Sequence, residues 1–194
     1  MYYSPFIVNP LSISRINELM IKFLEKAQPE VLTGNNPLDT EKLLERDLSQ
    51  YTDYQLDLVH ELPDGVEAQT CPQSKRVIFT LDTFSSLVQG NKRARFTAAH
   101  EVAHVLLHGE QLQNGSVQMN RAQEKIPIYQ QPEWQANTGA GALLMPSEAL
   151  KLLLQTVPRQ DLVTKMTKVF EVSRKAAEVR LEQIKKIADY KLLQ

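Results

Sequence analysis

The chain has 194 residues, of which 42% are hydrophobic and 23% charged, and its formal net charge at pH 7 is -1. This balance is typical of a globular protein and argues against a strongly basic nucleic-acid-binding surface or an anionic-membrane partner. The first five residues contain no cationic region leading into an apolar run, and no later stretch is long enough to cross a bilayer. A lone cysteine, Cys71, cannot form an internal disulfide, and we expect it half-buried in a strand. The sequence therefore predicts a cytoplasmic protein without a membrane segment.

Hydrophobic spacing predicts helices first, then strands, then helices again. Ser12 is a good N-cap for an amphipathic helix over residues 12–27, and Asp39 can cap a second short helix over 40–48. Alternating and β-branched residues predict strands over 54–62, 66–71 and 75–81. The remaining helices are expected over 93–108, 131–144, 147–156, 158–169 and from 173 into the 180s. This order indicates an α+β fold with a small, mainly antiparallel sheet, in which the strand 75–81 is expected at an edge.

The chain is expected to form a metallopeptidase domain over residues 1–157 and a helical C-terminal segment over 158–194 that packs on it. Residues 109–130 show no clear periodicity, and such a long irregular stretch is typical of a lid or of a segment that contacts substrate. The last residues, from 185 onwards, are expected to be a fraying helix end.

The sequence His100-Glu101-Val102-Ala103-His104 is an HExxH motif on a predicted helix. Residues four apart lie on one helix face, about 6 Å apart along the axis, so the two imidazoles can converge on one zinc ion. Glu101 then flanks the site as a general base, where it can accept a proton from a zinc-bound water whose pKa the metal lowers to about 7. The motif therefore predicts a zinc-dependent peptide-bond hydrolase.

A third zinc ligand has to come from elsewhere in the chain. His108 lies about 12 Å along the helix from His100, too far for both to bind one ion, so a supporting contact or a helix-terminal role is expected for it. The acidic candidates downstream are Glu110, Glu124, Glu133, Glu148 and Asp161. Spacing favours Glu133, with Asn137 one turn later as a supporting partner, although an acidic residue that only stabilises a helix N-terminus would look the same.

Three blocks of this chain resemble the signature of the ImmA/IrrE family of bacterial zinc metallopeptidases: RFTAAHEVAHVLLH over 95–108, EWQAN over 133–137 and LLMP over 143–146. A fourth block, over 170–181, is similar to the family's C-terminal helical pattern. The resemblance implies a zincin-like fold and a zinc ion on His100, His104 and Glu133. It also implies a protein substrate, since members of this family cleave a helix-turn-helix repressor that is often encoded beside them.

The chain departs from the family pattern at two positions. Ala103 stands where the family usually has glycine, and Gly139 stands where it usually has phenylalanine. The second change removes an aromatic side chain and loosens a helix, since glycine costs about 1 kcal/mol there relative to alanine. Trp134 would then fill part of the missing volume.

Residues 160–183 have the pattern of a helix-turn-helix, with an apolar core at Leu162, Val163, Met166, Val169, Phe170, Ala176, Ala177 and Leu181. Arg174, Lys175 and Arg180 could contact DNA, but glutamates interleave with them and no one-signed face emerges. Packing against the peptidase, or docking of a repressor, is therefore favoured over DNA binding. The alternative to an enzyme is a non-proteolytic regulator, such as a toxin-antitoxin component or a DNA-binding protein. Because Glu101 is not a metal ligand, a purely structural zinc would not require it, and this favours the enzyme.

Overall fold

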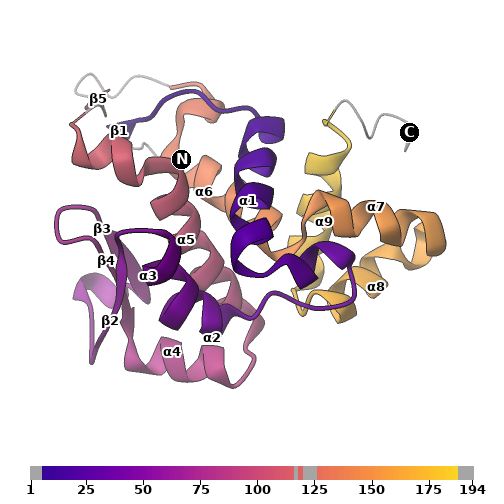
Figure 1. Ribbon diagram of the computed structural model, residues 1–194, viewed down its shortest axis with the longest axis horizontal. Helices are drawn as coiled ribbons and strands as arrows, with labels where there is room; N and C mark the ends of the chain where they lie inside the picture. Colours follow the sequence, from indigo (N-terminus) through magenta and orange to yellow (C-terminus); the bar gives the residue numbers. More distant parts are fainter. Residues whose placement is uncertain (1–5, 116–117, 120–125, 188–194) are drawn as a thin grey trace.

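The computed structural model describes residues 6–115, 118–119 and 126–187 of the chain (Figure 1). The helices are α1 (Ile13–Ala27), α2 (Thr40–Lys42), α3 (Leu48–Tyr51), α4 (Leu81–Val88), α5 (Lys92–Gln113), α6 (Pro132–Leu144), α7 (Ser147–Thr156), α8 (Leu162–Val169) and α9 (Arg174–Ile184). The strands are β1 (Phe6–Ile7), β2 (Gln55–Val59), β3 (Ala68–Cys71), β4 (Arg76–Thr80) and β5 (Gln118–Met119). The predicted α+β class is confirmed, and so is the broad order of helices, strands and helices, but β1, α4 and β5 were not predicted.

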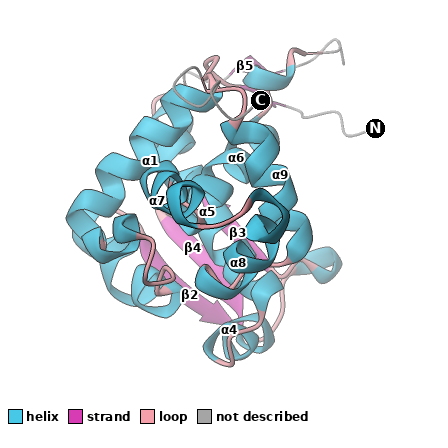
Figure 2. Cartoon of the chain, turned by 90° about the vertical axis from the view of Figure 1, so that its right-hand side faces the viewer, coloured by secondary structure: helices cyan, strands magenta, loops and turns pink. Residues whose placement is uncertain are grey.

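The sheet that supports α5 has the order β2-β4-β3, and it is mixed (Figure 2). β2 pairs with β4 in parallel, whereas β3 pairs with β4 antiparallel. The prediction of a mainly antiparallel sheet is therefore wrong for these three strands, as is the prediction that residues 75–81 form an edge. The turn at Pro63–Gly65 does not join neighbouring strands, because β2 and β3 lie on opposite sides of β4. Val77 and Phe79 of this central strand are fully buried.

α5 runs through the middle of the molecule, with the sheet and α4 on one side and α7, α8 and α9 on the other (Figure 1). Its N-terminus is capped by Asn91, whose side chain accepts hydrogen bonds from two backbone amides of the first turn. Ala98, Ala99, Val102 and Ala103 are completely buried. Small apolar side chains on several faces let neighbouring elements surround this helix, and they place the HExxH motif inside the protein.

The closest approach of α5 and α6 depends on the two positions at which the chain departs from the family pattern. A Cβ atom added at Gly139 would lie 2.8 Å from the Cβ of Ala103 and 3.3 Å from Cδ1 of Leu107. The space at Gly139 is thus filled by α5 itself. Trp134 is not among the three nearest neighbours of that position, which are Ala103, Leu107 and Met20.

The C-terminal helices are anchored by a buried arginine. Arg180 is 1% exposed, donates from Nε to the carbonyl of Met145 at 2.9 Å and from Nη2 to Oδ1 of Asn17 at 2.6 Å. Asn17 in turn donates to Ser147 at 2.6 Å, so α9 is joined to α1 and to the start of α7. Because it is buried, Arg180 is not available to contact DNA, although the sequence named it as a candidate together with Arg174 and Lys175. The division of the chain at residue 157 stays a prediction.

Several boundaries differ from those predicted. α4 was not expected, and it begins where Thr80, the last residue of β4, caps the helix by accepting from the amide of Thr83. α5 continues five residues beyond His108, so only part of 109–130 is irregular. Of the lid expected over 109–130, residues 116–117 and 120–125, including Glu124, lie outside the described residues, as does the chain end at 188–194. Within the described ranges, no helix combines the length and apolarity that a bilayer crossing needs.

Candidate metal centre

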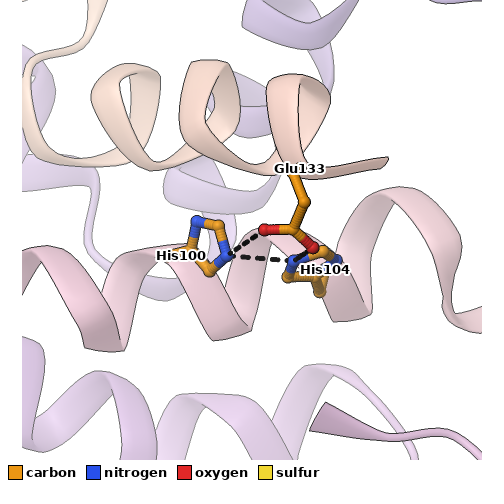
Figure 3. A group of neighbouring side chains, drawn as sticks. All are labelled: His100, His104 and Glu133. Atoms are coloured by element: carbon orange, nitrogen blue, oxygen red, sulfur yellow. Dashed lines mark hydrogen bonds and ion pairs between the residues drawn. The ribbon is translucent and has the colours of Figure 1, made fainter. Parts of the chain in front are cut away.

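Three ligand atoms converge where α5 passes the start of α6 (Figure 3). Nε2 of His100 and Nε2 of His104 are 3.0 Å apart, and each lies 3.4 Å from one carboxylate oxygen of Glu133. Zinc bonds of about 2.0–2.1 Å in tetrahedral geometry place neighbouring ligand atoms about 3.3 Å apart. The spacing of these three side chains therefore fits a tetrahedral zinc ion with one position left open.

The helices explain why the three side chains meet. His100 and His104 are one turn apart on α5, and Glu133 stands in the first turn of α6, where its carboxylate also faces the positive end of the helix. Hydrogen bonds from His100 and then His104 lower the pKa of Glu133 below its ordinary range, so this carboxylate stays ionised as a metal ligand requires. The side chains of His100 and His104 are 16% and 15% exposed and that of Glu133 is 55% exposed, so the group opens to solvent.

Asn137 supports the first histidine. Its Oδ1 lies 3.2 Å from Nδ1 of His100, so it can hold a proton on that nitrogen and leave Nε2 free for a metal. The sequence suggested Asn137 as a partner one turn after Glu133. In the structure its hydrogen bond goes to His100 instead.

A buried chain of hydrogen bonds supports the second histidine. Nδ1 of His104 lies 3.1 Å from Nδ1 of His108, and Nε2 of His108 lies 2.9 Å from Oε1 of Gln135. The amide nitrogen of Gln135 donates to the carbonyls of Asn9 at 2.8 Å and Tyr129 at 2.7 Å, which fixes the amide with its oxygen towards His108.

These contacts determine which ring nitrogens carry protons. Burial, and then the nearby His104, lower the pKa of His108 to about 4, so its ring is neutral at pH 7. Since Nε2 of His108 must donate to Gln135, its Nδ1 accepts, and Nδ1 of His104 is the donor in that pair. Nε2 of His104 is then left with a lone pair directed at the metal position. His108 thus contacts His104 and Gln135, and its role as a supporting residue that does not bind metal stays a prediction.

Glu101, which follows His100 on α5, contacts the sheet. It is 7% exposed, and its carboxylate accepts a hydrogen bond of 2.7 Å from the hydroxyl of Thr70 on β3. The same hydroxyl lies 3.2 Å from the backbone carbonyl of Glu101. The carboxylate is therefore held between the metal helix and an edge strand.

Two residues of this site were not found from the sequence. Both act through contacts between elements distant in the chain. Thr70 belongs to no local motif, and Gln135, although it lies in the EWQAN block, had been given no role. The other described acidic candidates, Glu110, Glu148 and Asp161, are not part of a three-residue metal-ligand group in the described ranges.

Comparisons with known proteins bear on the same region. Residues 88–182 match a family model, Peptidase_M78, described as an IrrE N-terminal-like domain. None of the curated proteins compared with the chain matches it. Among solved structures, a Mycobacterium tuberculosis transcriptional regulator has a similar fold, with a TM-score of 0.59 and 14% identity over 91% of this chain. The chain spans 58% of that protein, and at this identity the likeness concerns the fold alone.

The matched region contains α5 and α6 with the converging His100, His104 and Glu133, and it overlaps the blocks whose resemblance was recognised in the sequence. Residues 88–182, just under half of the chain, match the IrrE N-terminal-like domain of the M78 peptidase family.

Proposed function

We propose that this protein is a zinc-dependent endopeptidase that cleaves a specific helix-turn-helix repressor. The observation that carries the proposal is the convergence of His100, His104 and Glu133 at distances suited to zinc. When bound, a zinc ion lowers the pKa of water to about 7 and polarises a carbonyl oxygen. Glu101 accepts a proton from the attacking water and passes it to the leaving amine. Thr70 holds the Glu101 carboxylate in place by hydrogen bonding.

The free edge of β3 is suited to receive the substrate backbone. Glu67 accepts a backbone hydrogen bond from Thr80 at 3.1 Å, and the register pairs Ala68 with Phe79 and Thr70 with Val77. Because antiparallel pairs alternate between bonded and non-bonded, the N–H and C=O groups of Ala68 and Thr70 point away from β4. An extended peptide can therefore add to β3 as a further strand beside Glu101. β3, and not the strand 75–81 that the sequence placed at an edge, is therefore the strand that we propose receives the peptide.

The proposal of a selective cut rests on the family resemblance. The resemblance to ImmA/IrrE proteins implies a repressor as substrate. We therefore propose a regulatory cut in one protein, with the repressor encoded beside this gene as the first candidate.

The test combines metal content with cleavage. We expect the purified wild-type protein to bind one zinc ion and to cut the neighbouring repressor. Glu101→Gln should retain zinc and lose cleavage, whereas Glu133→Gln should lose zinc, typically with a 10- to 100-fold or greater loss of affinity. Zinc-loaded wild-type protein that leaves the repressor intact, while both it and Glu101→Gln bind it tightly, would favour the alternative of a non-proteolytic regulator.

A further inference from the structure

A cavity of about 420 Å³ lies beside the candidate metal centre, between the first half of α5, α6 and α9. It shares one residue with the surroundings of the metal ligands, since Asn137 lines the cavity and hydrogen-bonds His100. The proposed mechanism does not use this cavity.

The cavity continues the line of the metal ligands along both helices. Phe96 precedes His100 by four residues on α5, and Gly141 follows Asn137 by four residues on α6; both line the cavity. One such step is about 6 Å along a helix axis. An extended peptide advances about 3.3 Å per residue, so a substrate lying over the metal would bring a side chain one or two residues from the scissile bond to this cavity.

The walls of the cavity are mainly apolar. Phe96, Val172, Ala176 and Val179 contribute to them, and Val179 is 44% exposed although it is a large hydrophobic side chain. An apolar substituent that entered would leave water for this surface, a gain of about 25 cal/mol per Å².

The charges on the lining are of one sign. Its charged lining residues are Lys92, Arg93, Lys175 and the buried Arg180, and no aspartate or glutamate lines it. Arg93 is paired with Glu67 at 2.9 Å, whereas Lys92 and Lys175 have no salt bridge among the described residues. A cationic side chain entering this cavity would meet like charges.

We propose that this cavity is a specificity pocket, which accepts an apolar side chain of the protein substrate close to the scissile bond and rejects a cationic one. The inference rests on the proposed function, because the metal position fixes where the scissile bond would lie. It adds a selection rule for the cut that the metal ligands alone do not provide.

The probes are succinyl hydroxamates, whose hydroxamate binds zinc and whose neighbouring carbon carries hydrogen, methyl, butyl or 4-aminobutyl. Dissociation constants for the zinc-loaded full chain are measured by calorimetry. We expect butyl to bind about 10-fold or more tightly than hydrogen, the usual size of an apolar pocket's discrimination. The 4-aminobutyl probe should lose most of that gain, although its chain is as long as butyl.

Two variants test whether this cavity causes the preference for the butyl probe. Gly141→Leu adds a side chain to its lining and should abolish the preference for butyl, while Val179→Glu should favour 4-aminobutyl over butyl. Leu152→Glu is the matched control, because Leu152 is a 46% exposed apolar helix residue that does not line the cavity. It should leave the order of the probes unchanged.

A failure of the proposed zinc site and a failure of the specificity pocket give different results. If none of the four hydroxamates binds the zinc-loaded chain, the proposed zinc site is wrong and the inference falls with it. If all four bind equally well, or if Val179→Glu and Leu152→Glu act alike, the zinc site stands and the specificity pocket is refuted.

Discussion

Nε2 of His108 lies 2.9 Å from Oε1 of Gln135, and this buried hydrogen bond joins α5 to α6 behind the candidate metal ligands. We expect Gln135→Met to weaken zinc binding by about 10- to 100-fold, because His108 would lose its acceptor and His104 its orientation. Competition with a chromophoric chelator measures the change. Gln111→Met is the control, since the Gln111 side chain also contacts the backbone of Asn9 but does not touch a histidine. Equal losses in the two variants would show that only the N-terminal segment had been disturbed.

The same chain of contacts predicts the tautomers of two histidines in the metal-free protein. We expect His104 to carry its proton on Nδ1 and neutral His108 to carry its proton on Nε2, because the Gln135 amide is fixed by two carbonyls. Nitrogen-15 chemical shifts at pH 7 distinguish the tautomers. A proton on Nδ1 of His108 would contradict the proposed order of donors.

The contact between Thr70 and Glu101 predicts a defect in activity without a loss of metal. Thr70→Val keeps the shape of the side chain and removes the hydroxyl that donates to Glu101. We expect kcat/KM for repressor cleavage to fall by about 10-fold, with zinc affinity unchanged, whereas Thr70→Ser should keep most of the activity. Full activity of the Thr70→Val protein would show that the hydroxyl of Thr70 is not needed for cleavage.

The packing of Gly139 predicts an asymmetric response to added methyl groups. Gly139→Ala should lower the free energy of unfolding by about 1–2 kcal/mol, since overpacking outweighs the gain in helix propensity. Gly141→Ala should raise it by up to about 1 kcal/mol, because a Cβ there would lie 3.5 Å from its nearest neighbour, an ordinary contact. Urea unfolding measures both. Adding Ala103→Gly to Gly139→Ala should restore stability, and no restoration would mean that strain arises elsewhere.

The parts of the protein that could be predicted are those that local sequence patterns determine. The α5 and α6 helices, the HExxH geometry and the exclusion of His108 as a ligand follow from residue spacing along a single helix. The choice of Glu133 also needed the family resemblance, since an acidic residue at a helix start can be a metal ligand or can only stabilise the helix N-terminus. The parallel pairing of β2 with β4 and the roles of Thr70 and Gln135 depend on contacts between distant segments. The spacing of residues along one element does not predict such contacts. The register of a small sheet depends on the elements that pack against it.

Arg180 has a consequence for the chain as a whole. It joins α9 to Asn17 on α1, and α9 also supplies a wall of the cavity beside the metal ligands. Truncation before this helix would remove the buried arginine that bonds to the first helix, together with the apolar contacts of Ala177 and Ile184. We therefore expect the N-terminal helix, the metal helices and the C-terminal helices to melt in one cooperative transition. A fragment that ends at residue 157 would then retain every metal ligand and still lack the framework that aligns them.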